Sequence, residues 1–151
     1  MAVTVKGKYL TDTTLCVFGD VLVASEYKSS KEIVCHAPPA SAQKVIFKVR
    51  NFEGVFSAGH VKYTYDHETV VANVSVAVGP QSGGVDVFVG GSNFKNTDTV
   101  KCKFNDTIVN GVWLSASRVQ CMAPPHKRGT VRIRVSNNGF DFSTTYAEFT
   151  Y

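Results

Sequence analysis

The chain has 151 residues, of which 44% are hydrophobic and 19% charged, and its formal net charge is +4 at pH 7. This composition is typical of folded globular domains, and it argues against a disordered or low-complexity protein. The net charge is too small to require a nucleic acid or an anionic membrane as the partner. No window reaches the roughly 18 apolar residues of a membrane span, and the first residues lack the apolar stretch of a signal peptide.

Two copies of one sequence pattern follow each other along the chain. Each copy contains Cys-x-Phe and, further on, a second cysteine just before Ala-Pro-Pro. Cys16 and Cys35 of the first copy correspond to Cys102 and Cys121 of the second, at an offset of 86 residues. A repeat of this kind predicts two copies of one small domain. We place the first domain at residues 1–66, a linker at 67–71 and the second domain at 72–151.

The expected elements of the first repeat are short strands, because its apolar residues recur with a period of two. Strands are expected within residues 3–7, around 16–18, around 33–35 and across 45–50. Between them the chain is punctuated by Gly, Asn and Pro, and no stretch shows sustained helical spacing. The pattern therefore predicts half-buried strands of antiparallel sheets.

The second repeat contains matching strands at residues 87–91, 100–104 and 131–135. It also has an extended segment at 72–78, followed by a glycine-rich loop, and the first repeat has no counterpart of this segment. We therefore expect the leading strand of the first repeat to be missing and the chain to be a piece of a longer array. Several short strands in each repeat predict an all-β chain of two small sandwiches, each with two sheets.

The two cysteines of each repeat are 19 residues apart, and each lies in the apolar register of its strand. A disulfide joining the two sheets would stabilise each repeat by about 3 kcal/mol. The even count and the repeated spacing indicate an oxidising compartment. Four buried free thiols in a cytosolic protein are the alternative. Zinc binding has less support, because no Cys-x-x-Cys occurs and His36 is replaced by Met122 in the second repeat.

The pattern of the second repeat resembles an IPT/TIG domain. The resemblance is carried by Gly91 to Phe94, Cys102 and Phe104, Cys121 before Ala-Pro-Pro, Ser136 to Gly139, Phe142-Ser143 and Phe149 to Tyr151. The first repeat matches from Val5 to Tyr65, except that Lys8-Tyr9-Leu10 stands where Gly-Ser-Asn-Phe is expected. The resemblance implies two tandem immunoglobulin-like sandwiches of the early-set type. In the receptor branch of the family the cysteines are typically disulfide-bonded, so the resemblance implies an extracellular, cell-surface protein.

We expect a non-enzymatic binding or spacer module of a larger receptor or adhesion protein, whose partner is a protein or a neighbouring IPT/TIG domain. We expect association with a membrane only through an anchor elsewhere in the parent protein. No cofactor, catalytic or metal site is expected, because the four histidines stand singly, at His36, His60, His67 and His126. Two alternatives stay open: an intracellular DNA-binding or dimerisation domain of a Rel-type transcription factor, and an accessory domain of a carbohydrate-active enzyme.

The sequence predicts two kinds of surface site, one from sequons, which apply to an extracellular chain, and one from strand alternation. Asn73-Val74-Ser75 and Asn105-Asp106-Thr107 are sequons, which predict N-glycosylation at Asn73 and Asn105. Strand alternation also predicts partner-binding candidates on one outer face of each repeat. These candidates are Leu15, Val17, Ile46, Lys48 and Arg50 in the first repeat, and Lys101, Lys103, Arg132 and Arg134 in the second.

The two predicted faces differ in chemistry. In the first repeat we expect Leu15, Val17 and Ile46 to be exposed together, as an apolar patch of the kind that marks a protein contact. In the second repeat the four basic residues are expected to converge on one solvent-facing surface. The alternative for the basic set is a solvated sheet face that discourages edge association.

Overall fold

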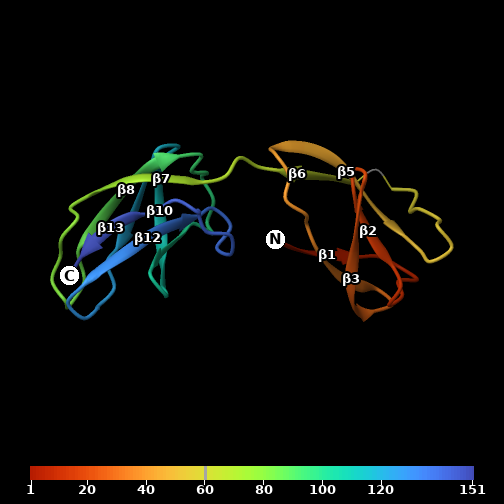
Figure 1. The fold of residues 1–151 in the computed structure, drawn as a ribbon, viewed down its shortest axis with the longest axis horizontal. Coiled ribbons are helices and arrows are strands. Elements are labelled where there is room, and N and C mark those ends of the chain that lie inside the picture. The colour runs from red at the N-terminus through yellow and green to blue at the C-terminus, as the bar shows by residue number, and fades with distance from the viewer. Residues whose placement is uncertain (60) are drawn as a thin grey trace. The chain divides into compact units, whose positions relative to one another are not determined.

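The computed structural model describes residues 1–59 and 61–151, and these form thirteen strands and no helix. The chain divides into two compact units, residues 1–67 and 68–151 (Figure 1). The prediction of an all-β chain of two tandem sandwiches is confirmed. Within the described ranges no helix is long and apolar enough to cross a membrane. His60 lies outside the described residues.

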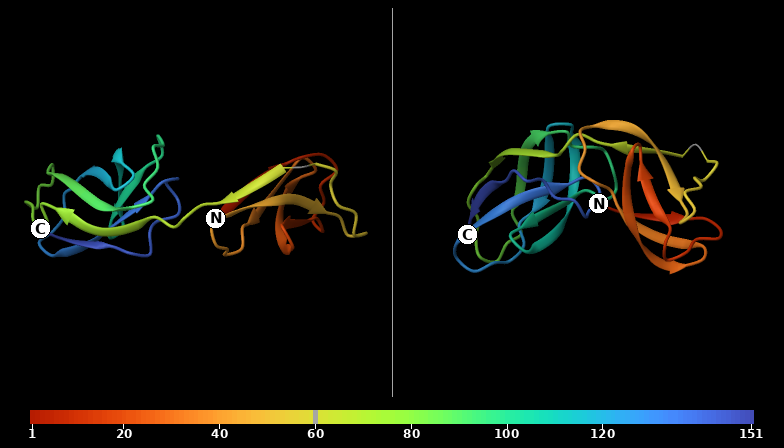
Figure 2. Two further views of the ribbon diagram at one scale, coloured as in Figure 1. Left: turned by 90° about the horizontal axis from the view of Figure 1, so that it is seen from above. Right: turned by 45° about the vertical axis from the view of Figure 1, so that its right-hand side comes forward.

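The first domain is one antiparallel sheet that bends into two layers. Its strands are β1 (Ala2–Lys6), β2 (Leu15–Phe18), β3 (Val21–Ser29), β4 (Glu32–His36), β5 (Gln43–Arg50) and β6 (Val61–Tyr65), in the spatial order β1-β4-β3-β2-β5-β6. The first part of β3 pairs with β2, and its second part pairs with β4. The bend within β3 therefore places β2, β5 and β6 in one layer and β1 and β4 in the other (Figure 2).

The second domain repeats this architecture with one additional strand. Its strands are β7 (Val70–Ser75), β8 (Asp86–Ser92), β9 (Lys101–Phe104), β10 (Thr107–Ser115), β11 (Arg118–Met122), β12 (Thr130–Ser136) and β13 (Ala147–Thr150), in the order β13-β12-β9-β10-β11-β8-β7. β10 bends as β3 does, pairing first with β9 and then with β11. β7 pairs with β8, and no strand in the described part of the first domain pairs with β1 in the corresponding way.

The second domain begins earlier than the sequence predicts. β7 starts at Val70, and Val71 is buried in the second core, so these two residues are not part of a linker. The amide of Val71 donates to Thr145 Oγ1 at 2.7 Å, and the hydroxyl of Thr144 donates to Glu68 Oε1 at 2.6 Å. The Thr144 hydrogen bonds also lower the pKa of Glu68 below its usual value. Residues from Glu68 onward are therefore held by the second domain, because Val71 supplies an apolar side chain that its core encloses.

Both predicted cysteine pairs are disulfides in the structure. Cys16 is bonded to Cys35 and Cys102 to Cys121, with Cα–Cα distances of 6.4 and 6.3 Å. The first disulfide joins β2 to β4 and the second joins β9 to β11, so each links the two layers of its domain. All four sulfur-bearing side chains are buried, as expected from their apolar register.

A tyrosine near the end of each domain packs into its core. Tyr151 donates its hydroxyl hydrogen to the Pro124 carbonyl oxygen at 2.6 Å, and its ring packs edge-on against Phe149 with centroids 5.0 Å apart. Tyr65, at the equivalent position of the first domain, packs against Tyr63 with centroids 4.9 Å apart. Burial raises the pKa of both phenols above the usual 10.0.

We expect these two phenols to make the protein less stable as the pH rises above 10. The folded state then holds the phenolic protons more tightly than the unfolded chain does, so the free energy of unfolding falls with pH. The measurement is urea unfolding between pH 9 and pH 11. Replacing both Tyr65 and Tyr151 by Phe should flatten this decline, whereas Tyr9→Phe, at an exposed side chain, should leave it as in the unmodified protein. An unchanged slope in the double variant would show that other groups cause it.

Candidate functional site

The predicted partner-binding residues lie on equivalent outer faces of the two domains. β2 pairs with β5, and β9 pairs with β12, so the strand neighbours that the sequence predicts are found in both domains. Val17 lies opposite Lys48, and Lys103 lies opposite Arg134. Since successive side chains point to opposite sides of a strand, these residues face away from the core that the neighbouring Cys and Phe side chains enter.

The second domain presents a basic face, which we define as Lys101, Lys103, Arg132 and Arg134 with the rings of Phe142 and Tyr146. Lys103 Nζ lies 5.6 Å from the centroid of Phe142. The guanidinium carbons of Arg132 and Arg134 lie 4.5 and 5.6 Å from the centroid of Tyr146. The rings therefore hold three of the four cations in place, each contact contributing about 0.5–1 kcal/mol at an exposed site.

Among the described residues, the cations of the basic face lack carboxylate partners. None of the four forms an ion pair with a carboxylate in the described residues. Arg134 donates instead to the Ser143 carbonyl oxygen at 3.1 Å, and Lys101 donates to Asn110 Oδ1. Like charges directly opposite each other, as at Lys103 and Arg134, destabilise a sheet. This face therefore carries positive charge that is free to meet an acidic surface.

A shallow pocket of about 360 Å³ opens on the basic face. It is lined by Lys103, Asn105, Asp106, Arg132, Arg134 and Phe142. Its lining brings the turn between β9 and β10 next to β12, although these segments are far apart in the sequence. Asp106 places one carboxylate at the border of the cationic cluster, and the rest of the charged lining is positive.

The first domain presents an apolar face, which we define as Leu15, Val17, Leu22, Ile46 and Phe56 with Lys48 and Arg50 at its border. Leu22, Ile46 and Phe56 are 46%, 46% and 50% exposed. Together with Val17 they line a shallow pocket of about 520 Å³. Lys48 Nζ and the guanidinium carbon of Arg50 lie 5.9 and 5.8 Å from the centroid of Phe56. The face thus combines exposed apolar side chains with two cations at its border, and Asp20 adds one carboxylate to the lining of the pocket.

The expectation that Val17 is exposed is wrong. Val17 is only 6% exposed, and Leu15 is half-buried, whereas Ile46 is exposed as predicted. Val17 points away from the core, but Leu22 and Lys48 flank it on the neighbouring strands and Phe56 lines the same pocket. It therefore forms the floor of the apolar face and not its surface.

Sequence reasoning missed Leu22 and Phe56 as members of the apolar face. Leu22 could have been found from the short turn between β2 and β3, because a hairpin there places it opposite Val17. Phe56 could have been found from the repeat, since the offset of 86 residues relates it to Phe142 of the basic face. The burial of Val17 has no such local signal.

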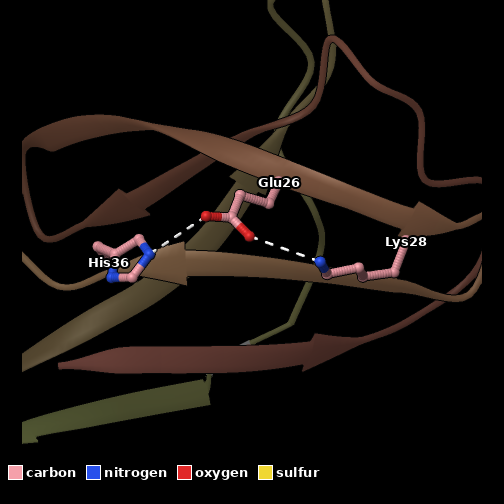
Figure 3. Close-up of polar contacts among 3 residues, drawn as sticks. All are labelled: Glu26, Lys28 and His36. Atoms are coloured by element: carbon pink, nitrogen blue, oxygen red, sulfur yellow. Dashed lines mark ion pairs between the residues drawn. The ribbon is translucent and has the colours of Figure 1, made fainter.

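The first domain also carries a small charged cluster on the outer side of its other layer. Glu26 lies between Lys28 and His36, with nitrogen–oxygen distances of 3.6 and 3.5 Å (Figure 3). All three side chains are exposed, and surface pairs of this kind contribute little to stability. In the described residues no group of three or more His, Cys, Asp or Glu side chains could hold a metal ion.

The two sequon asparagines occupy different kinds of surface. Asn105 lies in the turn between β9 and β10 with φ of 51°, and its Oδ1 accepts from the Arg132 amide at 2.9 Å. Asn73 lies in β7, the edge strand of its sheet. Both side chains are exposed, and glycosylation at these positions stays a prediction.

Comparison with known proteins establishes the family. The IPT/TIG domain profile matches residues 2–65 and 70–151, so the chain belongs to the IPT/TIG family and contains two such domains. A search of curated proteins finds no match. The solved structures that resemble the chain include the extracellular region of plexin A4. One, with domains 1 to 10, has a TM-score of 0.59 at 18% identity and covers 99% of this chain and 14% of that chain.

Two further solved structures resemble the chain less closely. A second structure of the plexin A4 extracellular region, with domains 1 to 8, has a TM-score of 0.53 at 18% identity and covers 99% of this chain and 16% of that chain. SGBP-B of the Bacteroides ovatus mixed-linkage glucan utilization locus, in complex with a mixed-linkage heptasaccharide, has a TM-score of 0.41 at 13% identity, with coverages of 99% and 42%. The chain spans about a sixth of the plexin chains, and at these identities the likeness concerns the fold.

Proposed function

We propose that the chain is a non-enzymatic, extracellular binding module of a larger cell-surface protein, and that it acts through the outer sheet faces of its two domains. The observation that carries the proposal is a difference in side-chain chemistry between the equivalent outer faces of the two domains. Ile46 of the apolar face corresponds to Arg132 of the basic face, and Val17 corresponds to Lys103. The buried cysteines and Phe18 are unchanged at the same offset. One scaffold therefore offers two different surfaces, which suits two different contacts.

The disulfides support the extracellular location. Paired cysteines persist in oxidising compartments and are rare in the cytosol. The DNA-binding alternative of the Rel type requires an intracellular chain, so both disulfides count against it. For the carbohydrate alternative, the resemblance to surface glycan-binding proteins is too distant to carry an argument.

The apolar face suits a protein partner with apolar side chains bordered by carboxylates. Leu22, Ile46 and Phe56 are half exposed around the floor formed by Val17, so a partner can remove them from water. Lys48 and Arg50 at the border favour acidic residues on the partner's rim. By the same argument the basic face suits a more strongly acidic protein surface.

We expect the double variant Leu22→Glu and Ile46→Glu to weaken partner binding by about tenfold or more, because it buries two carboxylates against an apolar surface. The measurement is biolayer interferometry of the secreted chain against a panel of purified ectodomains that includes this chain itself. The matched control carries Ile108→Glu and Arg132→Glu, at the equivalent positions of the second domain. Circular dichroism checks that every variant is folded.

The control separates the two faces. A partner that the first variant loses and the control retains binds the apolar face. A panel without any bound ectodomain, or one bound equally by all variants, would contradict the proposed function.

A further inference from the structure

The second domain has another exposed apolar surface, on the outer side of the layer opposite the basic face. We call it the β11 face, and it consists of Phe88, Val112, Leu114, Arg118 and Met122. Val112, Leu114 and Met122 are 42–58% exposed. Phe88 is half-buried under Arg118, whose guanidinium carbon lies 4.5 Å from the ring centroid. Exposed apolar side chains gathered on one side of a sheet mark a candidate contact surface.

Strand register brings these residues together. Phe88 of β8 lies opposite Gln120 of β11, and Gln120 lies opposite Val112 of β10. The alternate residues of the same strands, such as Val87 and Val119, enter the core. Phe88, Gln120 and Val112 therefore form a row across three strands on the solvent side.

The side chain of Asn73 reaches over this face from the edge of the sheet. Asn73 of β7 lies opposite Gly90 of β8, next to an irregularity in the pairing after Val71. Its Oδ1 lies nearest to the point that a Cβ of residue 90 would occupy, and its Cγ and Nδ2 lie 3.1 and 3.4 Å from that point. The amide therefore lies directly over Gly90, in the space that any larger residue would fill.

Gly90 lies beside the β11 face, on the same side of the sheet. It is two residues from Phe88 on the same strand, and it lies opposite Arg118 of β11. The amide of Asn73 thus lies over β8, on the strand position that pairs with Arg118. Asn73 is exposed, and its side chain forms no hydrogen bond with any described residue. A group attached to Nδ2 therefore starts from an exposed side chain that lies next to the β11 face.

We propose that Asn73 carries an N-linked glycan whose first sugar residues cover the β11 face. The proposal rests on the extracellular location given above. In the linkage step, Nδ2 forms a bond to the anomeric carbon of an oligosaccharide carried on a lipid pyrophosphate. The pyrophosphate leaves with the electron pair of the broken carbon–oxygen bond, and one amide proton is lost to a base. The sequon Asn73-Val74-Ser75 supplies the acceptor that this reaction requires.

The chemistry of a sugar matches the β11 face. One side of a pyranose ring presents C–H groups, which pack against Phe88 and Met122, while its hydroxyl groups meet water and Arg118. β7 is also the edge strand of its sheet, and a glycan there prevents another chain from pairing with it. The glycan thus covers both the exposed apolar residues and the open edge.

The test uses the full chain secreted from insect cells, with Asn73→Gln and Ser75→Ala as two separate ways to remove the sequon. Thr107→Ala is the matched control, because it removes the other sequon, beside the basic face, and leaves the hydrogen bond from the Arg132 amide to Asn105 Oδ1 in place. Intact-mass spectrometry measures glycan occupancy, and fluorescence of the dye ANS measures exposed apolar surface. We expect both Asn73-site variants to lose one glycan mass and to bind several-fold more ANS, and the control to bind no more than the unmodified chain.

A further variant assigns the added ANS signal. In the Asn73→Gln background, replacing Val112 and Leu114 by Ser should return ANS binding to the level of the glycosylated chain. A secreted, disulfide-bonded chain without a glycan at Asn73 overturns the proposal and leaves the proposed function intact, since partner binding through Ile46 is measured separately. If Asn73 carries a glycan but its removal leaves ANS binding unchanged, the proposed packing of the glycan on the β11 face is overturned. A chain retained in the cell with free thiols overturns the proposed function together with the glycan.

Discussion

Replacing Cys16 and Cys35 together by alanine is expected to unfold the first domain while the second domain stays folded. The disulfide spans a sequence separation of 19 residues. Its loss removes about 3 kcal/mol of stability, through the entropy that the unfolded chain regains. Among the described residues the core cluster of the first domain has six buried members, against sixteen in the second domain. With so few buried side chains, the first domain has little further stability to lose.

The matched control is the double variant Cys102→Ala and Cys121→Ala, whose cysteines have the same separation of 19 residues. We expect a similar loss of free energy, but a second domain that remains folded at 25 °C because of its larger core. Hydrogen exchange followed by mass spectrometry of peptides from each domain distinguishes the two cases. Full protection of the first domain without its disulfide would show that its core suffices.

Replacing Phe149 by alanine is expected to destabilise the second domain by about 3–5 kcal/mol. Phe149 is fully buried, and its ring packs edge-on against Phe104 and Tyr151 with centroids 6.1 and 5.0 Å apart. Gly79 leaves room for this ring, since a Cβ there would lie 2.6 Å from Phe149 Cζ. A smaller side chain at position 149 therefore leaves a cavity between the two layers.

The only tryptophan of the chain, Trp113, makes this effect easy to follow, because it packs against the core of the second domain. Urea unfolding monitored by Trp113 fluorescence should shift to lower urea in Phe149→Ala. Tyr63→Ala is the matched control, at the equivalent half-buried position of the first domain, and should leave the Trp113 transition in place. A shift below about 1 kcal/mol for Phe149→Ala would mean that the surrounding side chains close the cavity.

Much of the fold is predictable because its signals are local or repeated. The period of two along each strand separates Cys102 and Phe104, which enter the core, from Lys101 and Lys103. The offset of 86 residues predicts that both domains share these strands. The spacing of the cysteines predicts a disulfide between two layers. The resemblance to IPT/TIG domains adds the sandwich architecture, which periodicity alone does not specify.

The candidate faces are less predictable, because exposure depends on neighbours that the chain brings from elsewhere. Alternation predicts that Val17 points away from the core, but not that its neighbours on the sheet leave it only 6% exposed. It also cannot show that Val71 enters the second core, where the sequence pattern suggests a linker.

The sequence by itself determined the two-domain organisation, the strands that show clear alternation, the cysteine pairs and the side of the sheet to which the residues of those strands point. These properties follow from the order of residues along a strand and from the repeat. The tertiary structure alone decided which outward residues stay exposed, where the second domain begins, and that Asn73 lies over Gly90 beside the β11 face. The physical reason is that burial is a property of atoms packed across strands, and the partners of those contacts are far apart in the sequence.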